Sequence, residues 1–208
     1  MNKYITFSLW GDNKKYCIGA IRNAELALKY YIDWDVLIFY NSSVDDYYIN
    51  ILDHFNNVKL IDCTNANISP WFWRFIPTFN KDNITIIRDC DSRLSEREYN
   101  CVITWMNTNY KYLIIRDHER HYDFPMLAGM WGCKEPIHID YYNTMINDYA
   151  NKDYYLIDQE YLSNVIWPEA QLNSMIIGIK EDINFKLSRN PETFIGQSYT
   201  EFDIGIYK

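Results

Sequence analysis

The sequence predicts an α/β domain with a mostly parallel central sheet and helices on both of its faces. Strand-like apolar runs alternate with amphipathic helical segments from the first residues onward, and this alternation is typical of βαβ units. The most β-branched run ends in a charged turn, NITIIRDCDSR (residues 83–93), and open α/β sheets bind ligands at such carboxyl ends of strands. No repeat or linker divides the 208 residues, so we expect one domain over residues 1–208, either alone or within a longer polypeptide.

The first part of the chain predicts three strands joined by helices. An apolar strand over residues 3–10 is closed by Gly11, and a helix follows from about Tyr16 to Ile32. The other elements expected before the charged turn are strands over residues 36–40 and 58–63, a helix over 44–55, and a helix over 69–75 with Pro70 in its first turn.

The second part of the chain predicts more helices than strands. We expect helices over residues 95–107, 140–149 and 158–166, the last ended by Trp167-Pro168, and strands over 112–115 and, at a sheet edge, 175–179. Gly129 and Gly132 stand in a strand-like run, which indicates close approach of a ligand or of another backbone. The tail over residues 188–208 shows no clear periodicity.

The charged turn contains the strongest candidate for chemistry. If the extended backbone persists, Asp89 and Asp91 point the same way with Cys90 opposite, and their Cα atoms stand roughly 7 Å apart. Two like charges at that spacing suit a hard cation with oxygen ligands, and Arg88 and Arg93 could hold an anion beside it. That combination suits a diphosphate, whereas the plainer interpretation is a solvated turn rich in Asp and Ser.

Composition and absent motifs exclude several classes of protein. The net charge of −8, without a basic stripe, argues against nucleic acid as a partner. The five cysteines lack a CxxC pattern, so we expect reduced thiols in a cytosol-like compartment rather than disulfides or zinc. The chain starts as a strand rather than a signal peptide, and no apolar run approaches the 18 residues of a transmembrane helix. Motifs of dehydrogenases, P-loop kinases, serine hydrolases and HExxH metalloproteases are missing.

A set of short blocks in a fixed order resembles the GT-A glycosyltransferases, metal-dependent enzymes that use nucleotide-sugar donors. The blocks are WRF (73–75), RDCDSR (88–93) with Arg97-Glu98 after it, IRDH (115–118), AGMWGCK (128–134) and DQEYL (158–162). Over roughly residues 3–200 the set is similar to small members from bacterial surface-polysaccharide loci and from large DNA viruses. The resemblance implies the Rossmann-like GT-A fold and a cytoplasmic location, which for a viral protein is the host cytoplasm.

The resemblance also implies roles for individual residues. Asp89 and Asp91 would hold Mn²⁺ or Mg²⁺ against the diphosphate of the donor, expected to be a UDP-sugar. The remaining implied donor-site residues are Phe7, Ser8, Leu9, Trp10, Gly11 and Tyr40 for the base and ribose, Arg74, Arg88 or Arg93 for the phosphates, and Cys90, Gly129 and Gly132 around the metal and the sugar. Many retaining members add a C-terminal histidine to the metal; this chain has none after His138, and Gln197 or water is the expected substitute.

The sequence does not decide between retention and inversion of configuration at the anomeric carbon. Asp158-Gln159 resembles the pair that retaining members place beside the anomeric carbon, which favours retention. An inverting enzyme needs a base near the acceptor hydroxyl, and Asp117, His118 and Asp158 are the candidates. The expected acceptor is a surface or capsid glycan. Two other functions remain: a nucleotidyltransferase or phosphohydrolase with the same carboxylates, and a non-catalytic sugar-binding module.

Overall fold

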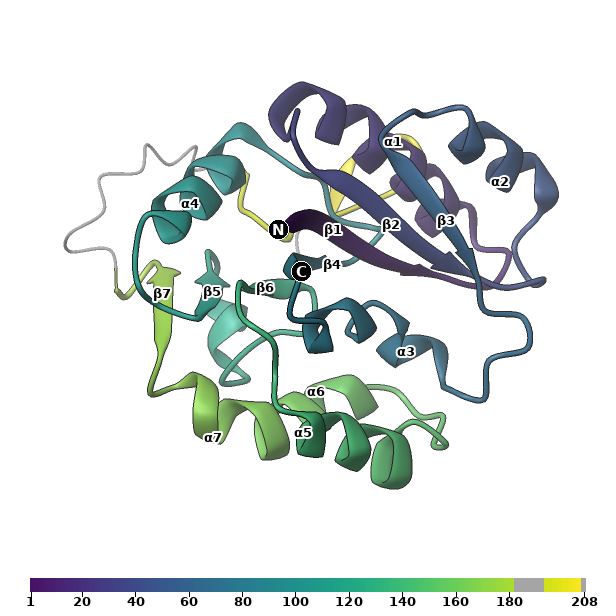
Figure 1. Cartoon of the computed structure of the whole chain (residues 1–208). Coiled ribbons are helices and arrows are strands. Elements are labelled where there is room, and N and C mark those ends of the chain that lie inside the picture. The colour runs from purple at the N-terminus through teal and green to yellow at the C-terminus, as the bar shows by residue number, and fades with distance from the viewer. Residues whose placement is uncertain (182–192, 207–208) are drawn as a thin grey trace.

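The computed structural model describes residues 1–181 and 193–206, and these contain a seven-stranded sheet in the order β3-β2-β1-β4-β6-β5-β7 (Figure 1). The strands are β1 (Asn2–Leu9), β2 (Asp35–Tyr40), β3 (Val58–Asp62), β4 (Asn83–Arg88), β5 (Tyr112–Arg116), β6 (Met130–Cys133) and β7 (Ser174–Gly178). All neighbouring pairs are parallel except those of β6, which runs antiparallel to β4 and β5. The predicted mostly parallel α/β sheet is therefore confirmed.

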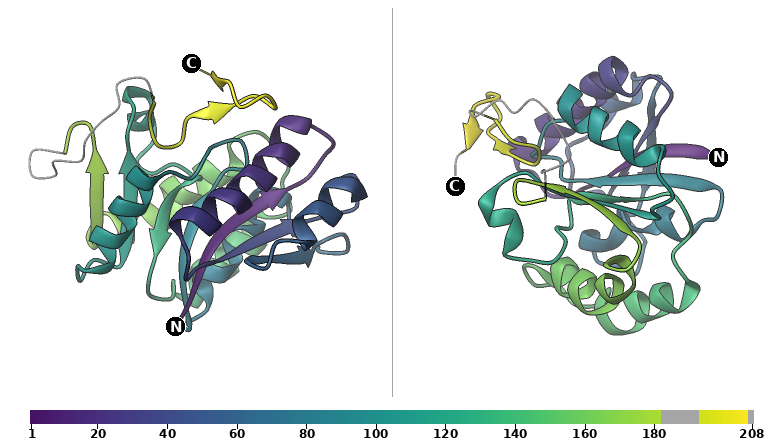
Figure 2. Two further views of the ribbon diagram at one scale, coloured as in Figure 1. Left: turned by 90° about the horizontal axis from the view of Figure 1, so that it is seen from above. Right: turned by 90° about the vertical axis from the view of Figure 1, so that its left-hand side faces the viewer.

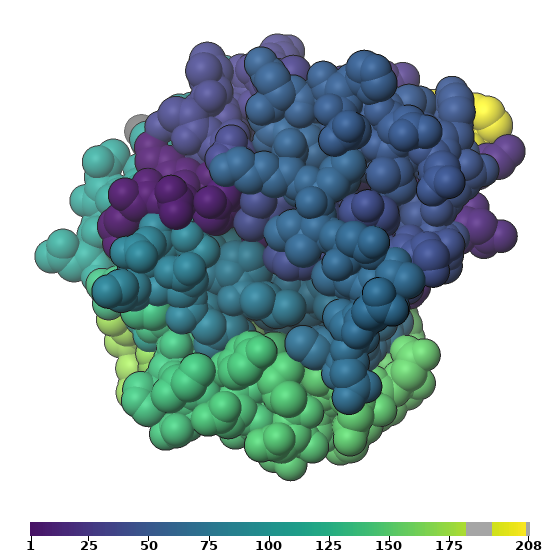
Figure 3. Space-filling view, turned by 45° about the vertical axis from the view of Figure 1, so that its right-hand side comes forward, coloured from purple at the N-terminus to yellow at the C-terminus, as the bar shows by residue number. Residues whose placement is uncertain are grey.

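Helices cover both faces of the sheet. They are α1 (Lys14–Tyr30), α2 (Asp46–Asp53), α3 (Pro70–Trp73), α4 (Glu96–Met106), α5 (Ile139–Thr144), α6 (Ile157–Tyr161) and α7 (Trp167–Ala170). In Figure 1, α1, α2 and α4 lie above the sheet, and α3, α5, α6 and α7 lie below it. From another side, the residues that carry α5 and α6 form a green band below the blue N-terminal half, to which α3 belongs (Figure 3).

Buried apolar side chains on each face explain this layering. The core shared by α1, α4 and the sheet includes Phe7, Leu9 and Trp105, which are fully buried. The core on the other face includes Phe75 and Trp131, which lie edge to face with ring centroids 5.5 Å apart. Most of β1 and all of β4 are buried, because a helical layer covers each face of the sheet.

Because β6 runs antiparallel to β4 and β5, its first residue lies at the edge of the sheet where those strands end. Met130, the first residue of β6, pairs with Arg88 at the carboxyl end of β4. A β-carbon on Gly132 would stand 3.1 Å from the carbonyl oxygen of Thr85, so the predicted close approach at this glycine is to backbone. The loop that ends in Gly129 therefore lies at the edge where β1, β4 and β5 end.

One local prediction was wrong, and a segment without a prediction contains two short strands. The helix expected to end at Trp167-Pro168 continues: π-helical turns at Leu162–Ile166 lead into α7, which has Pro168 near its start. A proline is tolerated there because the first turn of a helix does not need its N–H group. Of the tail over residues 188–208, only residues 193–206 are described, and they contain a two-stranded hairpin of β8 (Ser198–Tyr199) and β9 (Gly205–Ile206) beside α1 (Figure 2).

Among the described residues, no helix combines the length and the apolar character needed to cross a membrane.

Candidate active site

The Asp89–Ser92 segment is a turn, so the expected extended arrangement of the two aspartates was wrong. Strand β4 ends at Arg88, and the Ser92 backbone N–H then donates to the carbonyl oxygen of Asp89 at 3.2 Å. The buried Asn23 of α1 fixes the turn by donating to the carbonyl oxygens of Cys90, at 3.2 Å, and Ser92, at 2.9 Å. Because the chain turns, the two carboxylates meet different partners.

Asp89 lies between a buried arginine and a glycine. Its Oδ1 accepts a hydrogen bond from Arg74 Nη1 at 2.7 Å, and its side chain remains 44% exposed. A β-carbon on Gly129 would stand 2.9 Å from Oδ1 and closer still to Oδ2. Glycine at this position therefore leaves the space that the Asp89 carboxylate occupies at the sheet edge.

Arg74 links Asp89 to Asp158. Its Nη2 lies 2.8 Å from Asp158 Oδ2, and both side chains of this second pair are about 5% exposed or less. The Arg74 backbone is anchored on β1, because its N–H donates to Ser8 Oγ at 3.1 Å and its carbonyl accepts from Thr6 Oγ1 at 2.8 Å. Burial raises the pKa of Asp158, with the Arg74 guanidinium opposing this and Asp89 adding to it.

Gln159 holds the loop that carries Gly129. Its Nε2 donates to the carbonyl oxygen of Met126 at 2.9 Å, and its Oε1 accepts from the backbone N–H of Ala128. The side chain of Gln159 is 4% exposed. The structure thus gives Gln159 a positioning contact with the loop before β6.

Asp91 is held by residues from both ends of the chain. Its Oδ2 lies 2.6 Å from Lys15 Nζ in the first turn of α1 and accepts from Ser198 Oγ of β8 at 2.8 Å. The Tyr199 N–H donates to the Asp91 carbonyl oxygen at 2.8 Å. Ser198, rather than the neighbouring Gln197, is the tail side chain on Asp91; Gln197 is 1% exposed, and its Oε1 has no hydrogen-bond partner. The pKa of Lys15 is raised because its hydrogen bond and charge interaction with Asp91 outweigh the opposing effect of burial.

Sequence reasoning missed Lys15 and Ser198. A signal for the first was present, since cations in the first turn of a helix oppose its macrodipole and need a partner. No signal marked Ser198, which lies 107 residues from Asp91 in a tail without periodicity.

The expected nucleotide-binding residues at the end of β1 divide into two groups. Phe7 and Leu9 point into the core, where both are fully buried, so their side chains do not line the site. Gly11 has a φ of +76°, and its N–H donates to Ser43 Oγ at 2.7 Å. Trp10 and Tyr40, at the ends of adjacent strands, are partly exposed at the sheet edge.

Trp10 belongs to an aromatic group at the same edge. Its ring lies 5.0 Å from that of Trp71, which in turn lies 6.2 Å from that of Tyr155, centroid to centroid. Trp71 is three residues before Arg74, and Tyr155 is three before Asp158. The segments that carry Trp71 and Tyr155 are thus the ones that carry Arg74 and Asp158.

Three further expected ligand residues lie inside the molecule. Arg88 is 1% exposed and pairs with the buried Glu98 at 3.0 Å, so its guanidinium belongs to the core rather than to a phosphate site. Cys90 is buried and donates its S–H to the Ser8 carbonyl oxygen at 3.3 Å; burial raises the pKa of its thiol. Gly132 lies within β6, against Thr85 and the Trp105 ring.

Asp117 and His118 contact the segment before the hairpin. Asp117 Oδ1 pairs with Arg97, and its Oδ2 accepts from the Ile195 N–H at 2.8 Å. The His118 ring stacks on Phe194 with centroids 4.4 Å apart. The hydrogen bonds that the structure gives thus join Asp158 to Asp89 through Arg74, and Asp117 to a separate group.

The two aspartates suit a divalent cation only with help from a ligand. Carboxylate oxygens are the donors that Mg²⁺ and Mn²⁺ prefer, and the side chain of Asp89 remains 44% exposed. Within the described ranges, no cluster of three or more His, Cys, Asp or Glu side chains could hold a metal. Mg²⁺ is commonly bound by one or two carboxylates together with substrate phosphates, and Asp89 and Asp91 are the residues that would hold it in that mode.

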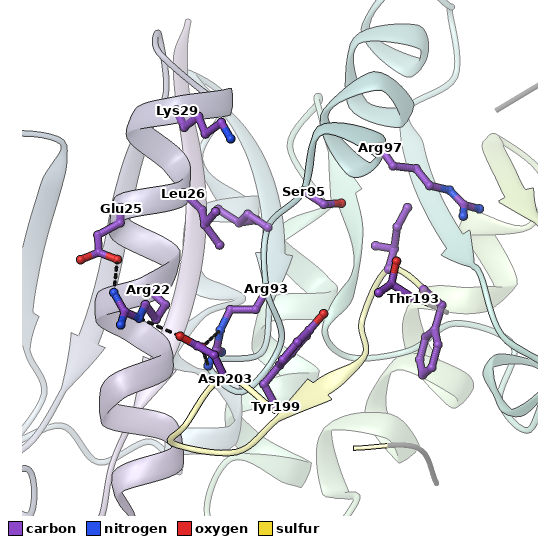
Figure 4. A pocket seen from close by; sticks show the side chains of 13 residues that line it. Arg22, Glu25, Leu26, Lys29, Arg93, Ser95, Arg97, Thr193, Tyr199 and Asp203 are labelled. Carbon is purple, nitrogen blue, oxygen red and sulfur yellow. Dashed lines mark hydrogen bonds and ion pairs between the residues drawn. The ribbon is translucent and has the colours of Figure 1, made fainter. Parts of the chain in front are cut away.

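A cavity of about 620 Å³ lies between α1 and the hairpin, apart from the Arg74–Asp158 pair (Figure 4). Arg22, Arg93 and Tyr199 are among its lining residues, and Asp203 bridges the two arginines at 2.9 and 2.8 Å. The bridge fastens the hairpin to α1 and to the turn after β4. The cavity therefore lies where the hairpin packs against α1 and the turn after β4.

Comparisons with known proteins identify the fold. No family model and no curated protein sequence matches the chain. The structure is similar to S. aureus TarS 1–349, with a TM-score of 0.56 and 11% identity over 85% of this chain and 58% of that chain. It is also similar to mannosyl-3-phosphoglycerate synthase from Rubrobacter xylanophilus, with a TM-score of 0.50 and 10% identity over 86% of this chain and 66% of that one. The chain thus spans less than two thirds of either relative's length. The likeness to these two structures shows the fold, and it is the GT-A fold that the sequence blocks implied.

Proposed function

We propose that this protein is a metal-dependent glycosyltransferase that moves a sugar from a nucleotide-sugar donor, expected to be a UDP-sugar, to a hydroxyl group of a glycan. One observation carries the proposal: Asp89, held by Arg74 and closely approached by Gly129, lies at the carboxyl edge of a GT-A sheet. Open α/β sheets bind nucleotides at this edge. Trp10 and Tyr40, partly exposed at the same edge, are candidates to contact the base.

The chemistry requires stabilisation of a departing nucleoside diphosphate. A divalent cation held by Asp89 and Asp91 would supply a Lewis acid for the charge that develops on the diphosphate. Arg74 keeps Asp89 in place and, through Asp158, is itself fixed in a buried position. Gln159 fixes the loop of Gly129, where the donor sugar would pass. Retention of configuration stays a prediction from the Asp158-Gln159 pair.

Release of the nucleotide from a panel of UDP-sugars, with and without Mn²⁺, tests the proposal. We expect one donor to be consumed only with metal, and Asp89→Asn and Asp91→Asn to lower turnover by at least about 100-fold. Asp82→Asn is the matched control, because Asp82 is exposed near the opposite end of the same strand. Anomeric analysis of the transferred product by NMR then decides between retention and inversion.

Other products would point to the other functions. Release of pyrophosphate or a nucleoside monophosphate would identify a nucleotidyltransferase or phosphohydrolase. Glycan binding that is the same with and without metal and UDP, together with no turnover of any donor, would identify a binding module. Full activity in both aspartate variants would remove the carboxylate pair from the mechanism.

A further inference from the structure

Each aspartate of the turn has its own cationic partner, and the two partners differ. Arg74 is 5% exposed and contacts two carboxylates, those of Asp89 and Asp158. Lys15 contacts Asp91 at 2.6 Å, and its side chain is 21% exposed. A lysine is a point charge on a flexible stem, whereas an arginine fixed by two carboxylates is held in one geometry. Of the two cations, Lys15 is therefore the one that can move.

The oxygen that Lys15 contacts already has a second partner. Asp91 Oδ2 accepts from Ser198 Oγ at 2.8 Å as well as pairing with Lys15. Ser198 is held in place because the next residue, Tyr199, donates its N–H to the Asp91 carbonyl oxygen. A divalent cation that binds Asp91 would thus compete first with the ammonium group of Lys15.

Lys15 lies at the start of α1, where its charge does not stabilise the helix. The first turn of α1 contains no acidic residue, and a cation there is unfavourable beside the positive end of the helix dipole. Asn13 caps this helix by accepting from the Lys15 N–H at 3.0 Å. The helix begins at the sheet edge where a donor diphosphate would lie, so a lysine released from Asp91 would have an anion within reach.

We infer that Lys15 stays paired with Asp91 until the metal and the nucleotide diphosphate bind together. The ammonium group of Lys15 then binds the diphosphate. This inference rests on the proposed donor site. Its consequence is that metal and nucleotide bind cooperatively: the metal alone displaces Lys15 without giving it a partner, whereas the diphosphate supplies one. Cooperativity of this kind is a coupling free energy between two ligands and is the same whichever ligand binds first.

Binding of Mn²⁺ to the full chain, measured by the EPR signal of free Mn²⁺ with and without UDP, tests the inference. The variant is Lys15→Met. The matched control is Lys14→Met, which removes the same charge from the neighbouring, exposed position. Without UDP, we expect Lys15→Met to bind Mn²⁺ about fivefold more tightly than Lys14→Met, because the competing ammonium is gone. With Mn²⁺ present, we expect Lys15→Met to bind UDP about tenfold more weakly than the control.

The opposite signs of the two effects separate this inference from its alternatives. Equal Mn²⁺ affinity in the two variants, or unchanged UDP affinity in Lys15→Met, overturns the role of Lys15. If Asp91→Asn also abolishes Mn²⁺ binding, the metal site of the proposed function is supported even though the role of Lys15 is overturned. If no variant, nor the unmodified chain, binds Mn²⁺ even with UDP, the metal site fails and the inference fails with it.

Discussion

Gly129 approaches the Asp89 carboxylate so closely that a side chain at its position would have to displace that carboxylate. A β-carbon would stand 2.9 Å from Asp89 Oδ1 and closer to Oδ2. Gly129→Ala should therefore push the carboxylate away from Arg74 and lower turnover by about 100-fold. The measurement is kcat/KM for donor hydrolysis.

Gly132→Ala is the matched control for this variant. Its β-carbon would stand 3.1 Å from the Thr85 carbonyl oxygen, inside the sheet and away from the carboxylates. We expect this variant to be less stable but to keep near-normal turnover per folded molecule. Equal turnover losses in the two variants would show that Gly129 matters only for packing.

The buried bridge of Arg74 predicts a stability loss that depends on pH. Arg74→Met leaves the Asp158 carboxylate buried without its partner, which costs about 3 kcal/mol where Asp158 is ionised. The pKa of Asp158 is already raised by burial and rises further without Arg74. The loss should thus be smaller at pH 5 than at pH 8, as urea unfolding at the two values would show. Adding Asp158→Asn should restore part of the stability; a loss that is the same at both pH values and in the double variant contradicts the bridge.

The pair of Arg88 and Glu98 should behave as a core element. Both side chains are 1% exposed or less, and burial raises the pKa of Glu98 against the pull of Arg88. Glu98→Gln leaves the Arg88 charge uncompensated and should cost about 3 kcal/mol in the free energy of unfolding. The double variant Arg88→Met/Glu98→Leu should lose less than this single change. A larger loss in the double variant would mean that the charges themselves hold the fold.

His121 should make the fold less stable in mild acid. Burial lowers its pKa from 6.5 to about 4, and its Nδ1 accepts from the Asp117 N–H at 3.0 Å. Between these values the unfolded chain binds a proton that the folded chain does not, so stability falls as the pH drops from 6.5 toward 4. From pH 6.5 to 4.5 this contributes a loss of about 2 kcal/mol.

Chemical denaturation of the unmodified chain and of His121→Asn measures that contribution. Asparagine keeps an acceptor for the Asp117 N–H but does not titrate in this range. The unmodified chain should lose about 2 kcal/mol more than the variant over the same interval. Parallel pH profiles for the two proteins would contradict the burial of a neutral imidazole.

The sequence predicted the sheet well because its strands are locally encoded. The run NITIIR is apolar and β-branched, which favours a strand over a helix. Ser95 caps the start of α4. The helix beyond Trp167 was missed because a proline usually ends a helix, whereas Pro168 lies in the first turn of α7, where its missing N–H group is tolerated.

The site was predicted less completely because charge partners come from distant residues. Arg88 and Asp89 are adjacent in the sequence, yet one lies in the core and the other at the edge. What separates them is Glu98, ten residues later on α4, and Arg74, fifteen residues earlier. No local pattern assigns these partners, so the sequence indicated Arg88 as a phosphate ligand where the structure shows a core ion pair.

The contact between Asp91 and Ser198 has a consequence for how the protein is made. It joins residues 107 apart, so the loop between them must be synthesised before the contact can form. Domains generally begin to fold from the N-terminal side while the ribosome is still adding residues. The β1–β4 part of the sheet can form early, but Asp91 gains its serine partner only after residue 198 has emerged. A ribosome-bound chain is therefore expected to hold a folded β1–β4 edge at which Asp91 still lacks the hydrogen bond from Ser198.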